Sequence, residues 1–189
     1  MLVTLDAAAA AQGVVFDDLD RAAAAHPDLV EPYLHALVPT DRSKFTALHG
    51  AFRSGGTFLH VPDGVRVELP LHALTYLDAD GAAIFPHTLV VAGRESEVTL
   101  VDRYVSPDLG RALSDAVVEI HLGAGAHVRY VSLQEWGEGV THLGVQRARL
   151  SRDSELRAVA VGFGGSLARA EAESALEEPG AASEMLGVF

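Results

Sequence analysis

The protein has 189 residues, of which 49% are hydrophobic but only 6% aromatic, so its core must be filled mainly by Ala, Val and Leu. Its 14 basic and 26 acidic residues give a net charge of -12, which repels nucleic acid and anionic membrane surfaces, and we expect neither as a partner. The absence of cysteine excludes disulfides and thiolate chemistry within the chain and fits a cytoplasmic protein.

The N-terminal stretch, residues 1–11, does not have the pattern of a signal peptide. It has no basic region before its apolar residues, and it carries a charge at Asp6. No other stretch has the length of a transmembrane segment. We therefore expect neither a signal peptide nor a membrane span.

Residues 1–55 are predicted to form a small helical region. Asp17 or Asp18 can cap a helix that runs to Ala25, because a carboxylate there can accept the free amide hydrogens of the first turn. Residues 28–38 place apolar side chains at helical spacing and predict a second helix.

A third helix, with Thr40 or Ser43 as its cap, is predicted to end at Gly55 and Gly56. Glycine accepts the left-handed conformation that a helix C-terminus often needs. Because no Gly-Lys-Ser/Thr follows, a phosphate-binding loop is excluded, and we interpret the glycine pair as a helix exit.

From residue 56 onward the hydrophobic period becomes two, and the pattern repeats. Five segments share a turn followed by alternating apolar residues, and their first inward residues are predicted to be Val67 (or Val65), Val98, Val128, Leu156 and Met185. These positions are 31, 30, 28 and 29 residues apart, a repeat of about 29 that is typical of stacked coils. We therefore predict a mainly β solenoid over residues 56–189. An antiparallel sandwich with evenly spaced hairpins is the alternative.

The first four units are also predicted to contain a second strand, at residues 71–77, 115–122, 141–150 and 166–176. The fifth unit ends at Phe189, without a capping helix or a polar last coil. Since the end of a solenoid exposes its core, we expect the solenoid to be incomplete there. The chain would then be part of a longer protein, or a partner would cover the open end.

Catalytic motifs are absent from the sequence, and we predict no catalytic residue and no metal site. None of the six histidines of the β region lies one or four residues from another, although stacked coils can bring distant histidines together. A histidine-bound metal enzyme is therefore one alternative. The carboxylate pairs Glu171/Glu173 and Glu177/Glu178 leave another, a β-solenoid enzyme acting on polysaccharide.

Residues 44–72, KFTALHGAFRSGGTFLHVPDGVRVELPLH, resemble the core of the SufB/SufD family of iron-sulfur cluster assembly proteins. The shared order is a helix ending in Ser-Gly-Gly, a strand ending in Val-Pro, an Asp-Gly-Val turn, and an alternating strand ending in Pro-Leu. The resemblance continues through residues 85–107 and 117–136. It implies a right-handed parallel β-helix preceded by a small α-helical region, in agreement with the repeat.

The resemblance also implies a function, that of a non-catalytic scaffold subunit of the SUF iron-sulfur cluster assembly complex. In that family B-type and D-type subunits pair with each other and with an ABC-type ATPase, SufC. Tyr104 stands where B-type members carry a cysteine, so the chain most resembles SufD. A SufB-like paralogue and a SufC-like ATPase are the implied partners. An iron-sulfur cluster, and a flavin, would be bound only by the assembled complex and not by this chain alone.

Three positions match family motifs. His87 corresponds to the arginine of the B-type Phe-Glu-Arg-Thr-Leu, and Gln134 and Trp136 match the B-type Val-Gln-Asn-Trp. By resemblance these positions lie inside the β-helix, and Gln134 and Trp136 lie along a polar path thought to carry sulfur in B-type members. The alternative is a structural role, in which Trp136 closes a coil and Gln134 forms hydrogen bonds with neighbouring backbone groups. The cluster-assembly residues and the SufC-docking segment of the family lie beyond the matched part.

Overall fold

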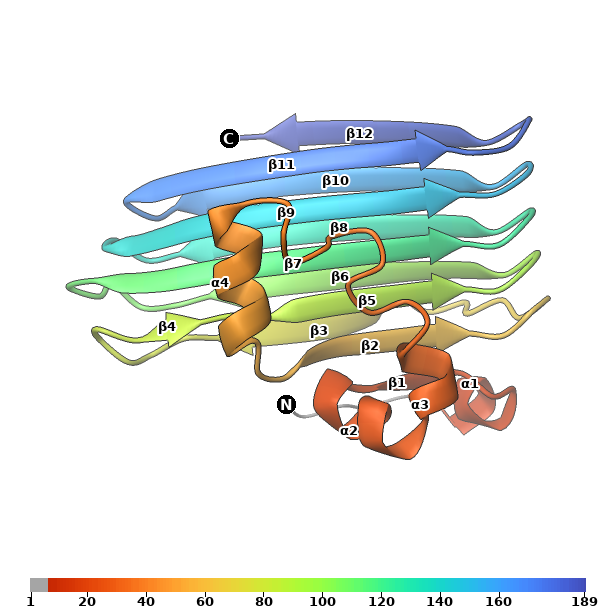
Figure 1. The fold of residues 1–189 in the computed structure, drawn as a ribbon, viewed down its shortest axis with the longest axis horizontal. Helices are drawn as coiled ribbons and strands as arrows, with labels where there is room; N and C mark the ends of the chain where they lie inside the picture. The colour runs from red at the N-terminus through yellow and green to blue at the C-terminus, as the bar shows by residue number, and fades with distance from the viewer. Residues whose placement is uncertain (1–6) are drawn as a thin grey trace.

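The computed structural model describes residues 7–189, which form a stack of strands preceded by short helices (Figure 1). Asp6, on which part of the signal-peptide prediction rests, lies outside the described residues. No helix of the described part is long and apolar enough to cross a membrane. The elements are α1 (Ala7–Ala11), β1 (Val15–Asp18), α2 (Leu19–Ala25), α3 (Pro27–Val30), α4 (Lys44–Phe52), β2 (Gly56–Val61), β3 (Leu71–Tyr76), β4 (Ala83–Ile84), β5 (His87–Ala92), β6 (Glu97–Val105), β7 (Ala112–Leu122), β8 (His127–Trp136), β9 (Val140–Leu150), β10 (Glu155–Gly164), β11 (Leu167–Leu176) and β12 (Ala182–Val188).

The strands form two sheets that face each other. One sheet has the order β1-β2-β5-β7-β9-β11, with β4 also beside β7, and the other has the order β12-β10-β8-β6-β3. From β5 onward the longer strands alternate between the two sheets, and every pairing of described strands except β1 with β2 is parallel. The parallel β-solenoid is therefore confirmed. The sandwich alternative is wrong, because hairpins would give antiparallel neighbours.

The coils become shorter toward the C-terminal end of the stack. Leu156 lies opposite Val128 on one side and Ser183 on the other, which gives steps of 28 and then 27 residues. Met185 lies opposite Ala158, so the predicted alignment of the fifth unit is wrong by two residues. The predicted inward face survives this error, because side chains alternate with a period of two.

The first coil departs from the predicted pair of strands. Arg66 lies opposite Glu97, but Leu71 lies opposite Leu100, so five residues on one side span three on the other. Pro70 has no N–H to donate, and the excess residues bulge out of the ladder. β3 therefore continues the same sheet, and residues 71–77 are not the second strand of the unit.

Of the predicted N-terminal helices, α2 is confirmed, but the segments directly before and after it differ from the prediction. The Asp18 side chain accepts hydrogen bonds from the backbone N–H groups of Asp20 and Arg21, which confirms Asp18 as the cap. Val15–Asp18, however, is a strand paired with β2. The helix predicted over residues 28–38 ends at Val30, because the amides farther along bind a side chain of β7 described below.

Ser43, and not Thr40, caps α4. The Ser43 Oγ accepts the N–H of Thr46, and the Thr46 Oγ1 accepts the N–H of Ser43, which makes a reciprocal capping box.

We expect Ser43→Ala to lower the free energy of unfolding by about 1 kcal/mol, as N-cap replacements typically do. Urea unfolding followed by circular dichroism would measure it. The matched substitution Thr40→Ala removes the other candidate cap and should cost less than half as much. Equal losses would mean that Ser43 is not the energetically dominant cap.

Gly56 begins β2 where only glycine fits. Its φ is +131°, and a Cβ there would lie 2.1 Å from the carbonyl oxygen of His87 on β5. The predicted glycine end of the helix is wrong, because α4 ends at Phe52 with Arg53 as its C-cap. The glycine pair lies beyond the helix and turns the chain into the first coil.

The solenoid buries apolar residues both inside the coils and on one outer face. The main interior core lies between the sheets, and the N-terminal helices cover the outer face of β2 and β5 with a second cluster that includes Leu19, Val30, Phe58 and Leu89. Figure 1 shows α4 lying across the outer face of the larger sheet. Because of this cover, β5 is buried on both faces.

Candidate functional site

A line of polar side chains runs through the interior of the solenoid. Alternation along the strands turns these side chains inward, beside residues of the apolar core. The line separates the main core from a smaller cluster that contains Tyr104, Trp136 and Val140. We call it the polar seam; its members are Thr88, Asp102, Ser114, Ser132, Gln134, His142 and Gln146.

Asp102 is the acidic residue of the polar seam, and only 1% of its surface is exposed. Its Oδ2 accepts hydrogen bonds from Thr88 Oγ1 at 2.6 Å, Tyr104 OH at 3.1 Å and Tyr130 OH at 3.0 Å. Burial raises the pKa of the Asp102 carboxyl, and the three hydroxyl donors oppose that rise. The pKa values of both tyrosines also lie well above their ordinary value through burial, so their hydroxyls remain donors. Asp102 thus ties β5, β6 and β8 together.

His142 forms the next layer of the polar seam. Its Nδ1 shares a hydrogen bond of 3.1 Å with Ser114 Oγ, and its ring lies 5.7 Å from that of Tyr104 and 5.9 Å from that of Trp136, between centroids. Burial lowers the pKa of His142 to about 4, so the ring is neutral near pH 7.

We expect His142 to make the folded protein less stable at acidic pH. In the unfolded chain its pKa is near 6.5, whereas in the fold it is about 4, so protons bind the unfolded state first and stability falls as the pH drops from 6.5 toward 4. That gap corresponds to about 3 kcal/mol. Urea titrations from pH 7 to 4 should show that the free energy of unfolding of the wild type falls by this amount relative to that of His142→Gln. Parallel curves for the two proteins would refute the assignment.

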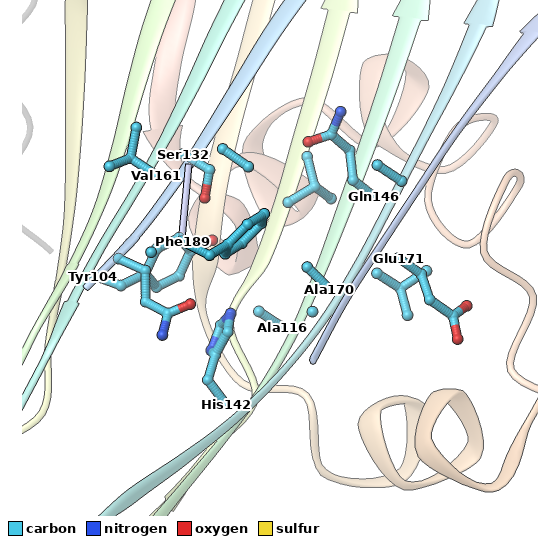
Figure 2. A pocket seen from close by; sticks show the side chains of 16 residues that line it. Tyr104, Ala116, Ser132, His142, Gln146, Val161, Ala170, Glu171 and Phe189 are labelled. Atoms are coloured by element: carbon cyan, nitrogen blue, oxygen red, sulfur yellow. The ribbon is translucent and has the colours of Figure 1, made fainter. Parts of the chain in front are cut away.

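A cavity of about 70 Å³ adjoins this layer, between the two sheets. In Figure 2 the side chains of Tyr104, His142 and Phe189 lie around it. Gln134 and Gln146 also line it, and their Nε2 groups find no acceptor among the described residues. The lining is mainly apolar, but the two amide groups face a space large enough for ordered water or a small hydrogen-bond acceptor. With no cysteine in the chain, none of its lining residues supplies a thiolate.

The structure separates the three positions that the family resemblance brought together. Gln134 and Trp136 point into the solenoid, where the Trp136 ring packs on Tyr104 with centroids 5.9 Å apart. His87 lies on the outer face of the larger sheet, because its neighbour Thr88 is the residue that faces Asp102. The expectation that His87 lies inside the β-helix is therefore wrong. A role of these residues in sulfur transfer stays a prediction.

The carboxylate pairs considered for a polysaccharide enzyme lie on the outside in polar contacts. Glu173 forms ion pairs with Arg42 and Arg147, and Glu171 with Arg169. Figure 2 shows the Glu171 carboxylate directed away from the cavity. These contacts favour the interpretation of both residues as a solvated, charge-paired face.

The contacts of Glu177 and Glu178 are of the same kind. Glu177 lies 3.9 Å from Arg149, and Glu178 accepts the backbone N–H of Arg152 at 2.8 Å. Nothing in this arrangement resembles two carboxyls set on either side of a substrate bond.

Sequence reasoning missed Asp102 and Glu119, two acidic residues with 1% and 0% exposure. The signal was present in the strands VTLVDRYV and AVVEIHL, since an acidic residue within an apolar strand needs a buried partner. Which partners it finds depends on contacts between coils, which the sequence pattern does not specify.

Fold and site together define a class: a parallel β-solenoid with a helical N-terminal region and a line of polar side chains in its interior. The chain belongs to the SufBD family. Residues 75–189 match the family model described as SUF system FeS cluster assembly, SufBD core domain, and residues 3–73 match the SufBD protein N-terminal region.

Curated relatives agree with this membership. The chain is 38% identical to the iron-sulfur cluster assembly protein SufD of Bacillus subtilis over 77% of its own length and 34% of that protein. It is 36% identical to SufB of the same organism over 72% of its length and 30% of that protein. An iron-sulfur cluster assembly SufBD family protein of Staphylococcus saprophyticus is 30% identical over 94% of the chain and 38% of that protein. The chain therefore spans about a third of the length of these relatives.

Proposed function

We propose that the protein is a SufD-like scaffold subunit, which pairs with a SufB-like paralogue and a SufC-like ATPase in iron-sulfur cluster assembly. Membership of the SufBD family supports the process. Identities of 36% to SufB and 38% to SufD do not separate the two paralogues. The assignment to the D type rather than the B type therefore rests on individual residues of the chain.

Tyr104 is the observation that carries this choice. It occupies the position where B-type members are expected to carry a cysteine, and it is 2% exposed with its hydroxyl bonded to Asp102. A buried phenol with a raised pKa cannot accept sulfur as a thiolate does. This part of the fold would serve as a structural support.

The same reasoning supports a non-catalytic subunit that binds no cluster by itself. Iron-sulfur clusters are held mainly by cysteine thiolates, and the chain contains none. The cluster, and any flavin, would then be ligated by the assembled complex.

Co-expression with SufB and SufC of the same organism tests the association. With an affinity tag on SufB only, the untagged protein should co-elute with SufB, and SufC should be present in the same fraction. Asp102→Asn serves as a folded comparison, because it changes only the interior and should co-elute equally well. Recovery of the chain in the unbound fraction, with SufB and SufC bound to each other, would refute the proposed pairing.

A further inference from the structure

Three histidines and a glutamate gather on the outer face of the larger sheet, beneath α4 and residues 31–38. His87 Nε2 lies 2.9 Å from Glu119 Oε2, and His87 Nδ1 lies 3.2 Å from His49 Nε2. His49 Nδ1 in turn lies 2.9 Å from the backbone oxygen of Asp115. His49, His87 and Glu119 are at most 1% exposed.

The order of donors along this chain of contacts is fixed at one end. A backbone carbonyl can only accept, so His49 Nδ1 carries the hydrogen that bonds Asp115. The Nε2 of a neutral His49 must then accept, and His87 Nδ1 must donate to it. A neutral His87 is left with a lone pair on Nε2, directed at a carboxylate oxygen only 2.9 Å away. Two electron-rich atoms at that distance require a positive species to bind both of them.

His35 supplies a third ligand at this place. Its ring centroid lies 5.0 Å from that of His87, and one ligand atom from each of His35, His87 and Glu119 lies within 4.8 Å of the others. His35 also has a φ of 60°, a left-handed conformation that is uncommon for a residue other than glycine. That conformation holds a partly exposed imidazole over a fully buried pair.

The surroundings match those of a metal ligand set. A ligating histidine usually donates its second ring N–H to a neighbouring acceptor, as His87 does to His49. Ligating carboxylates are in turn held by hydrogen bonds, and Glu119 accepts the backbone N–H groups of Leu37 and Val38 at 2.6 and 2.8 Å.

We propose that His35, His87 and Glu119 bind a divalent transition metal ion of the zinc class, with His49 as the partner that orients His87. Two imidazole nitrogens and one carboxylate oxygen are donors that zinc accepts, and a water would complete four-coordination. The ion would join residues 35–38 of the N-terminal region to β5 and β7. A single proton on His87 is the competing occupant.

Metal titration of the untagged, chelator-treated protein tests the proposal. Calorimetry with Zn²⁺ should give one site per chain, and Co²⁺ should give the intense visible absorption of a four-coordinate site. His35→Asn is the decisive variant, because asparagine tolerates the left-handed conformation and the fold should survive. It should weaken Zn²⁺ binding by tenfold or more, whereas His72→Asn, at an exposed histidine of β3, should leave binding unchanged.

Two results would overturn the proposal. One is the absence of stoichiometric Zn²⁺ binding by the wild type, which would leave a proton as the occupant. The other is equal affinity in the wild type and His35→Asn, both shown to be folded by circular dichroism. Neither result bears on the association with SufB and SufC.

Discussion

Glu119→Ala should destabilise the protein by about 4 kcal/mol. The Glu119 carboxylate faces His87 and accepts the backbone N–H group of Val38 in buried contacts, and it accepts those of His35 and Leu37 in partly buried contacts. Removing it leaves one buried and two partly buried backbone donors without an acceptor, each at a cost of about 1 to 3 kcal/mol, partly relieved where water enters. Residues 35–38 would then detach from the sheet.

Urea unfolding measures the loss of stability, and amide hydrogen exchange locates it. In Glu119→Ala the amides of Leu37 and Val38 should exchange much faster than in the wild type, while those of the interior strands keep their relative order of protection. Glu68→Ala, at an exposed glutamate, is the matched control and should change stability by less than about 0.5 kcal/mol. A cost below about 1 kcal/mol for Glu119→Ala, with these amides still protected, would contradict the anchoring role.

Asp102→Ala should cost about 3 kcal/mol, because it deprives Thr88, Tyr104 and Tyr130 of their shared acceptor. Asp102→Asn keeps an oxygen in the same place and should cost about 1 kcal/mol or less at pH 7. The pH dependence of stability distinguishes the protonated from the ionised form of the Asp102 carboxyl. Burial raises the Asp102 pKa above 3.8, so the stability contributed by the protonated form is present below that value and is lost as the pH rises through the folded pKa.

Chemical denaturation from pH 4 to 8 checks both statements. As the pH rises, the free energy of unfolding of the wild type should fall relative to that of Asp102→Asn, since only the wild type then buries a charge. An alanine variant as stable as the asparagine variant would show that the three hydroxyls find other acceptors. The polar seam would then not depend on Asp102.

The solenoid was predictable because its signal is local and repeated. Alternating apolar residues after a turn recur about every 29 residues, and parallel stacking of such units buries them in one core. Caps such as Asp18 and Ser43 were predictable for a similar reason, since each acts on the N–H groups two or three residues away.

The parts that the sequence did not predict depend on distant contacts or on strand phase. Residues 31–38 have a helical pattern, but Glu119, more than 80 positions away, binds their amides in a non-helical loop. His87 was expected inside the coil, although a shift of one residue along a strand exchanges the two faces. Thr88 has the inward place, and His87 joins His49 outside.

We propose that this chain supports cluster assembly without holding a cluster itself. Anaerobic reconstitution with iron and sulfide, followed by assay of iron and acid-labile sulfide on the isolated chain and on the co-purified complex, tests it most directly. Sulfide must be counted, because an iron ion at the His35, His87 and Glu119 site would carry none. We predict acid-labile sulfide on the complex and none above background on the isolated chain. Stoichiometric iron and sulfide on the isolated chain would contradict the claim.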